Sequence, residues 1–260
     1  MSVLTPAHRR GAELIDDPAI DGRTIVRSLE DVARSNALFG GRRAVLAALA
    51  PAFGEATGGA AGGALTLLDV GTGLGDIPWH ARRLAERRGV RLATFGVELS
   101  AALAAASRAR VTASVCADAF QLPFADRSVD VVTASQLAHH FTAEDTRRLF
   151  AELDRVARRL VVVGDLRRSY LAAAGFWLAS WPLGFHPVTR HDGVVSVFRG
   201  FTAAELAEHV RAAAPGARDL TVRRRLGWRV VASWRPGAPA PVATSGAPAA
   251  APDRPSALVA

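Results

Sequence analysis

Short apolar runs alternate with amphipathic segments from residue 65 to residue 234. The apolar runs have the composition of buried strands, whereas the segments between them repeat apolar residues at helical spacing. Strands are predicted at residues 65–70, 90–98, 111–117, 129–135, 160–165, 219–226 and 228–234, and helices at 77–88, 100–109, 142–157 and 202–213. This alternation predicts an α/β protein with a parallel sheet that helices cover on both faces.

Two further helices are predicted before the first strand. The first spans residues 24–39, and one of its faces carries Ile25, Leu29, Val32 and Asn36. Gly40 and Gly41 provide a stop, and a second helix over residues 42–50 is predicted to end at Pro51. We expect residues 1–60 to form an N-terminal helical cap with a glycine-rich linker.

The remaining chain is predicted to be one core with an insertion. Residues 61–235 form this core, with a lid insertion at residues 168–200. Residues 236–260, which are rich in proline and alanine, are expected to be a disordered tail. We expect the cap and the lid to close together over a binding site at the carboxyl ends of the strands.

The lid contains an uncharged stretch at residues 169–189. Its length raises the question of a transmembrane helix, but it is interrupted by Pro182, Gly184 and Pro187. We interpret it as a lid over an apolar acceptor. A helix that touches a membrane interface transiently, with Trp177 and Trp181 as anchors, is the alternative.

Composition narrows the class of protein. The 260 residues are 50% hydrophobic, which is typical of a globular chain, and the single cysteine, Cys116, excludes an intrachain disulfide. The net charge of +8 arises because 32 arginines outnumber 24 acidic residues, and many of these arginines stand in scattered pairs, so we expect solvated helix faces and no nucleic-acid partner. The N-terminus lacks the apolar core of a signal peptide, so we expect a cytoplasmic protein.

Three glycines follow the first predicted strand in the stretch LLDVGTGLGD. Gly71, Gly73 and Gly75 allow a sharp turn and a close approach of the backbone to a ligand. A dinucleotide-binding loop has the spacing G-x-G-x-x-G, but here Asp76 stands where the third glycine should be. A carboxylate at a helix N-terminus disfavours phosphate at that position, so a dinucleotide oxidoreductase is disfavoured.

Acidic and polar side chains also follow the next strands. Glu98 ends the second strand, where an acid can accept hydrogen bonds from both hydroxyls of a ribose. Asp118 ends the third strand and can accept a hydrogen bond from an exocyclic amine. The fourth strand ends in DVVTASQLAHHF, with small and polar residues before two histidines. One such feature at each strand end predicts a nucleoside-containing ligand.

This order of motifs resembles the class I S-adenosylmethionine-dependent methyltransferases, in particular their small-molecule (type 11/12-like) branch. The resemblance covers roughly residues 65–235 and implies a doubly wound, Rossmann-like, seven-stranded sheet with one antiparallel strand. It implies S-adenosyl-L-methionine as the cofactor, with its methionine part near Asp69, its ribose near Glu98 and its adenine near Asp118. The implied cofactor-binding residues are Asp69, Gly71, Thr72, Gly73, Gly75, Glu98, Leu99, Asp118, Ala119, Phe120 and Ser135.

Methyl transfer from a sulfonium requires alignment and exclusion of water, and we predict no metal. A phenol or enol acceptor benefits from a base, for which His140 and His191 are the candidates. We expect His191 and Asn36 to line the reaction chamber from opposite sides. The predicted acceptor is a small apolar or aromatic molecule such as a phenol, quinone or polyketide-like hydroxyl.

Several alternatives stay open at this point. The chain could be a C-methyltransferase of a quinone or lipid precursor, or a non-catalytic binding protein that kept the cofactor pocket. A nucleic-acid substrate is disfavoured, because the Asn/Asp-Pro-Pro-aromatic motif of base amine methyltransferases is replaced by SQLAHHF, and Cys116 lies inside a strand. The protein is expected to be a monomer or a homodimer.

Overall fold

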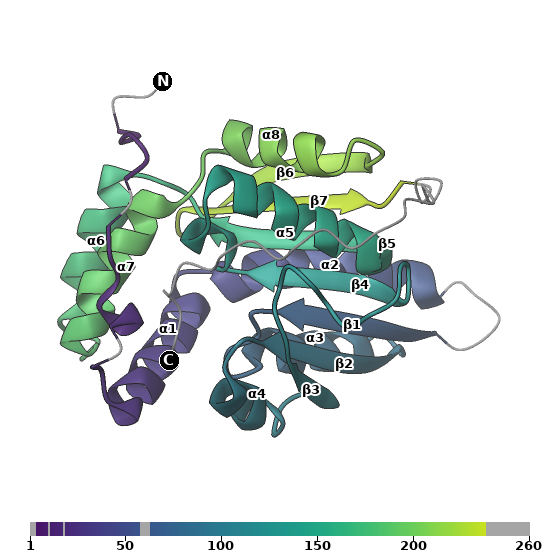
Figure 1. The fold of residues 1–260 in the computed structure, drawn as a ribbon, viewed down its shortest axis with the longest axis horizontal. Coiled ribbons are helices and arrows are strands. Elements are labelled where there is room, and N and C mark those ends of the chain that lie inside the picture. Colours follow the sequence, from purple (N-terminus) through teal and green to yellow (C-terminus); the bar gives the residue numbers. More distant parts are fainter. Residues whose placement is uncertain (1–3, 10, 18, 58–62, 238–260) are drawn as a thin grey trace, which may run out of the picture.

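The computed structural model describes residues 4–9, 11–17, 19–57 and 63–237, and one seven-stranded sheet forms its centre (Figure 1). The strand order is β3-β2-β1-β4-β5-β7-β6. β7 runs antiparallel to β5 and β6, and the other neighbouring pairs are parallel. This confirms the predicted doubly wound sheet with one antiparallel strand. The strands are β1 (Ala64–Val70), β2 (Arg91–Glu98), β3 (Ala113–Cys116), β4 (Val129–Ser135), β5 (Ala157–Leu166), β6 (Arg218–Arg225) and β7 (Arg229–Arg235).

Successive side chains of a strand pack on opposite faces of the sheet. Leu67 and Leu68 are both fully buried, but they belong to two different hydrophobic clusters. The cluster of Leu67 lies under α2 (Gly41–Thr57) and α3 (Asp76–Glu86), and that of Leu68 lies under α5 (Ala143–Val156) and α8 (Ala203–Ala213). Helices therefore cover both faces, as predicted, and α4 (Ala101–Ser107) packs against β2 and β3.

The second N-terminal helix is longer than the sequence predicts. Helix α2 continues through Pro51 and ends at Thr57, so the predicted end at Pro51 is wrong. A proline inside a helix removes one backbone hydrogen bond, but Ala52 and Phe53 on the following turn are buried in the core. The burial of these two side chains outweighs the helix-breaking preference of Pro51, so the helix continues beyond it.

Helix α1 (Gly22–Leu38) ends before the Gly40–Gly41 pair, as predicted, but its buried face differs from the prediction. Val32 is 38% exposed, and the buried residues are Ser28, Asp31, Ser35 and Asn36. The polar stripe faces α7, where Thr189 Oγ1 donates a hydrogen bond to Ser28 Oγ at 3.0 Å. The apolar stripe of α1 is thus left to line a cavity.

Two helices follow β5: α6 (Tyr170–Ser180) and α7 (Pro187–Arg199). They pack together at the end of the sheet to which the parallel strands point, beside α1 (Figure 1). The N-terminal segment with the short 3-10 helix η1 (Leu14–Asp16) crosses α7. The backbone amides of Leu14 and Ile15 donate to the Asp192 carboxylate at 2.7 and 2.9 Å, which fixes this crossing.

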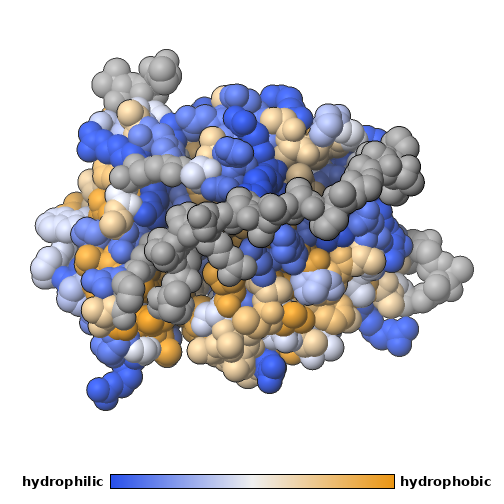
Figure 2. Space-filling view, in the orientation of Figure 1, coloured by the Kyte–Doolittle hydropathy of each residue, from blue (hydrophilic) through white to orange (hydrophobic). Residues whose placement is uncertain are grey.

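The outer face of α6 is apolar and exposed. Its large exposed side chains are Tyr170, Leu171, Trp177 and Leu178, and Trp181 follows directly. In Figure 2, hydrophobic residues are concentrated over the lower left of the molecule, near α1, α4 and α6, whereas hydrophilic residues dominate over α5 and α8. Among the described residues, no helix has both the length and the apolar character needed to cross a membrane.

Candidate active site

A cavity of about 450 Å³ lies between the carboxyl ends of the parallel strands and helices α1, α6 and α7. This volume lies within the range of about 300–1,000 Å³ that is typical of small-molecule sites. The sheet side of the cavity consists of the loop after β1 and the ends of β2 and β4. Six predicted cofactor residues line it: Asp69, Gly71, Thr72, Gly73, Glu98 and Ser135.

The glycine-rich loop adopts a conformation that disfavours other residues. Gly71, Gly73 and Gly75 have φ angles of +67°, +53° and +76°, in the left-handed region. A Cβ at Gly71 would also lie 3.0 Å from a Leu137 methyl group. The amides of Gly71 and Thr72 donate to the Val97 carbonyl at 2.9 and 3.2 Å, so β2 holds the loop in place.

Asp69, at the end of β1, lies under this loop. Its carboxylate is buried and accepts hydrogen bonds from Thr133 Oγ1 at 2.6 Å and Thr72 Oγ1 at 2.9 Å. Burial raises the pKa of Asp69 to about 7, although the two hydroxyls oppose this shift. Repulsion from Asp76 and Glu98 adds to the rise. A cation in the cavity would favour the ionised form of Asp69.

Two more carboxylates line the same side. Glu98 Oε1 accepts a hydrogen bond from the amide of Gly73, and burial nevertheless raises the pKa of Glu98. Burial also raises the pKa of Asp76, where Oδ2 has no hydrogen-bond partner among the described residues. Three carboxylates around one loop suit a ligand with positive charge and hydrogen-bond donors, and they disfavour phosphate.

The other predicted cofactor residues do not line the cavity. Asp118 is exposed and accepts a hydrogen bond from the amide of Phe120 at 2.9 Å, which is the geometry of a loop cap. Leu99 is 54% exposed. Gly75 lies behind the loop as the N-cap of α3. The adenine-contacting role of residues 118–120 therefore stays a prediction.

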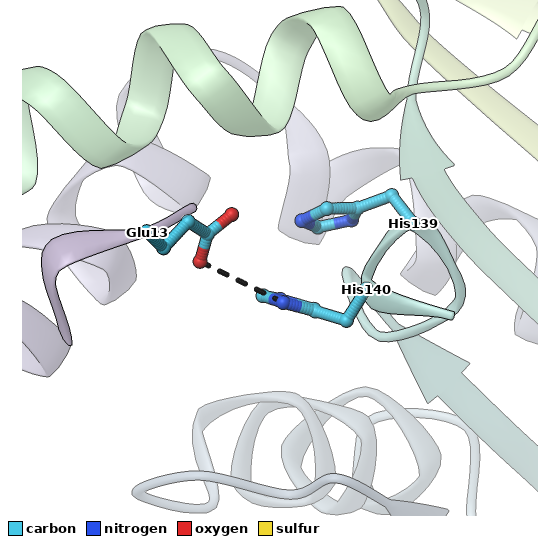
Figure 3. A group of neighbouring side chains, drawn as sticks. All are labelled: Glu13, His139 and His140. Atoms are coloured by element: carbon cyan, nitrogen blue, oxygen red, sulfur yellow. Dashed lines mark ion pairs between the residues drawn. The ribbon is translucent and has the colours of Figure 1, made fainter. Parts of the chain in front are cut away.

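Two histidines and a glutamate converge at the opposite side of the cavity (Figure 3). His139 and His140 belong to the short 3-10 helix η2 (Ala138–His140) after β4, and Glu13 comes from the N-terminal segment. His139 Nδ1 lies 2.7 Å from Asp165 Oδ1, and His140 Nδ1 lies 3.6 Å from Glu13 Oε2. Desolvation, His139 and Arg199 hold the pKa of His140 well below its usual value, although 31% of its side chain is exposed.

His191, the second predicted base, lies at the surface. Its side chain is 47% exposed, Nδ1 contacts Asp192 Oδ1 at 2.8 Å, and it does not line the cavity. Asn36 does line the cavity, so only one member of the expected pair faces the reaction chamber.

Besides Asp76 Oδ2, three more buried polar atoms of the cavity wall have no hydrogen-bond partner among the described residues: Asn36 Oδ1, Gln136 Nε2 and Arg229 Nε. Arg229 is buried, which lowers its pKa to about 10 against the attraction of Asp165. Gln136 has a φ of +54°, a conformation that is uncommon outside glycine. Unpaired buried groups are costly, so this wall is suited to a ligand with polar atoms of its own.

Sequence reasoning missed two residues of this site. Glu13 lies in a stretch without a recognisable motif, and nothing local indicates its position. Asp165 stands at the end of the predicted fifth strand. The acids at the ends of the first three predicted strands, Asp69, Glu98 and Asp118, occupy equivalent positions, so the sequence did contain a signal for Asp165.

Comparisons with known proteins concern the type of domain and the fold. Residues 68–162 match a family model described as a methyltransferase domain, whereas no curated protein is significantly similar in sequence. The fold is similar to that of the CurJ carbon methyltransferase, with a TM-score of 0.58 and 11% identity over 84% of this chain and 62% of that one. A chain in the complex of the Haloferax volcanii Trm112 methyltransferase activator has a TM-score of 0.51 and 17% identity, over 88% of this chain and 100% of that one. Magnesium protoporphyrin IX methyltransferase of Synechocystis PCC 6803, with bound S-adenosylmethionine, has a TM-score of 0.50 and 13% identity, over 84% of this chain and 99% of that one.

Proposed function

We propose that the chain is a class I S-adenosylmethionine-dependent methyltransferase whose acceptor is a small, largely apolar molecule with a hydroxyl group, such as a phenol, a hydroquinone or a polyketide. The observation that carries this proposal is the single cavity that joins the glycine-rich loop to the Glu13, His139 and His140 side chains. One end suits a cationic cofactor, and the other end suits a hydroxyl.

The cofactor occupies the sheet side of the cavity in this proposal. Its sulfonium and ammonium groups carry positive charge and it has no phosphate, which suits the carboxylates of Asp69, Asp76 and Glu98. Glu98 takes the ribose hydroxyls when the cofactor displaces the Gly73 amide from its carboxylate.

The acceptor lies between the cofactor and the lid. Leu29, Val32, Phe39 and Phe176 supply apolar surface from α1 and α6, which supports an apolar body. Asn36, Gln136 and Arg229 supply unpaired polar atoms, which support a further oxygen function such as a carbonyl or a second hydroxyl. The exposed apolar face of α6 supports transient contact with a membrane surface, from which such a molecule could enter.

In the reaction the acceptor oxygen attacks the methyl carbon in line with the carbon–sulfur bond. That bond breaks, its electron pair stays on sulfur, and S-adenosylhomocysteine leaves. The hydroxyl proton must also depart. The cluster of Glu13, His139 and His140 can serve this in two ways: a histidine takes the proton, or the three side chains hold a cation that lowers the pKa of the hydroxyl. His191 lies outside the cavity, so its role as a base has no support here.

The test is turnover of a panel of phenols, hydroquinones and polyketides, with S-adenosylhomocysteine and the methylated product both measured. S-adenosylhomocysteine alone should stabilise the protein by about 2.7 kcal/mol at 100 Kd, and NAD should not. Glu98→Ala should weaken binding of the cofactor by roughly 1–3 kcal/mol. If the cofactor binds but no acceptor of these classes is methylated, the proposed acceptor class is wrong.

A further inference from the structure

The side chains of Glu13, His139 and His140 offer one carboxylate and two imidazoles to a common point (Figure 3). One ligand atom from each lies within 4.8 Å of the other two. We infer that these three residues bind one divalent transition-metal ion, such as Zn²⁺, at the acceptor end of the cavity. The inference rests on the proposed function, because the ion would act on the acceptor hydroxyl.

The donor set selects the kind of ion. Imidazole nitrogen and carboxylate oxygen suit zinc and neighbouring first-row metals, whereas calcium and magnesium prefer oxygen alone. Bonds of about 2.0–2.2 Å require the three ligand atoms to approach one another more closely than they do now. All three side chains already face the same space (Figure 3), so rotation of the side chains is the movement that the site requires.

A second layer of contacts orients two of the three ligands. Asp165 holds His139 Nδ1 at 2.7 Å and accepts a bond from the His139 amide at 3.2 Å, which leaves Nε2 for a ligand. Ser196 Oγ donates to Glu13 Oε1 at 2.7 Å, and Arg199 Nη1 lies 3.0 Å from the same oxygen. Carboxylate partners of this kind orient histidine ligands in metal sites.

Arg199 also supports a competing interpretation. Its Nη1 lies 3.5 Å from His140 Nδ1, so in this interpretation Glu13 and Arg199 form an ion pair beside the two histidines, without a metal. The metal site would use Glu13 Oε2, which lies 3.6 Å from His140 Nδ1, whereas Arg199 pairs with Oε1. The two interpretations therefore differ in whether the intact cluster takes up a metal with defined stoichiometry.

Three protein ligands leave at least one coordination position open to the cavity. The acceptor hydroxyl takes this position, its proton passes to water, and the bound oxyanion keeps the lone pair that attacks the methyl group. The metal undergoes no change of oxidation state, and no further reactant is needed.

The experiment uses the full chain after removal of metal with a chelator. Titration with Zn²⁺ in a calorimeter should give one site, and Co²⁺ should give visible absorption bands typical of mixed nitrogen and oxygen ligands. His140→Ala and Glu13→Gln should each lower the affinity for Zn²⁺ at least tenfold, and Asp165→Asn by about 10–100-fold. His80→Ala, which removes a histidine of α3 outside the cluster, should leave the affinity unchanged.

Binding of S-adenosylhomocysteine to each variant verifies that the fold is intact. The inference is overturned if Zn²⁺ does not bind stoichiometrically, or if the cluster variants bind it as tightly as the parent protein. Methylation of an acceptor by the chelated protein at full rate would also overturn it, and would leave the proposed function standing. Stoichiometric metal binding without methylation of any acceptor would support the metal site and contradict the proposed acceptor class.

Discussion

Replacing Gly96 with alanine should weaken cofactor binding, although Gly96 does not line the cavity. A Cβ at this position in β2 would lie 2.7 Å from Thr72 Cγ2 and 3.3 Å from Thr72 Cβ. Thr72 cannot easily retreat, because its hydroxyl donates to buried Asp69 at 2.9 Å and its amide to Val97 O at 3.2 Å. The added methyl group must therefore displace the glycine-rich loop itself.

The expected magnitude follows from these contacts. Overpacking of a rigid site costs about 1–3 kcal/mol, and a hydrogen bond to a charged group is worth about 1.5–3 kcal/mol. We expect the free energy of unfolding to fall by about 2–4 kcal/mol, which lowers the Tm by roughly 4–16 °C. The Kd of S-adenosylhomocysteine should rise about tenfold or more, since about 1.4 kcal/mol of lost binding suffices for this.

Thermal unfolding and calorimetry with S-adenosylhomocysteine measure both effects. Thr72→Ser removes the nearest clashing atom and keeps the hydroxyl, so the double variant Gly96→Ala with Thr72→Ser should regain at least half of the lost affinity. Gly22→Ala is the matched control, because a Cβ there meets no atom within 4 Å. If Gly96→Ala behaves like Gly22→Ala in both assays, the coupling of β2 to the loop is refuted.

Three further predictions concern the charge of the cofactor side and the attachment of the N-terminal segment. Affinity for S-adenosylmethionine should rise as the pH increases through 7, because the pKa of Asp69 is raised to about 7 and only its ionised form attracts a cation; calorimetry on Asp69→Asn should show a flatter profile. The same shift means that the ligand-free protein should lose stability as the pH rises from the ordinary value of 3.8 through 7, since the native state holds the proton more tightly than the unfolded chain; urea unfolding over this range measures it. Asp192→Ala should lower turnover at least tenfold with little change in cofactor affinity. The amides of Leu14 and Ile15 lose their acceptor in this variant, so the segment that carries Glu13 is no longer held against α7. Unchanged turnover would show that this attachment does not affect the acceptor.

Local sequence determined the order of strands and helices and the glycine-rich loop of this protein. Hydrophobic periodicity reflects which face of a helix or strand is buried. Helices and strands can therefore be predicted from the sequence without knowing which other element covers that face. The left-handed φ angles of Gly71, Gly73 and Gly75 are likewise a local property. The placement of Asp69 and Glu98 followed, because parallel strands bring their carboxyl ends to one edge of a sheet.

Tertiary packing decided the features that depend on partners distant in the chain. Helix α2 passes Pro51 because Ala52 and Phe53 meet the sheet, and no local rule includes that burial. Glu13 reaches the histidines because Asp192 of α7 holds the N-terminal segment by two backbone amides, a contact between residues far apart in sequence. The sequence alone indicated the chemistry of the cofactor side, where loop and strand ends are local. The acceptor side is assembled from an N-terminal segment, a 3-10 helix and a lid, and only their packing brings its residues together.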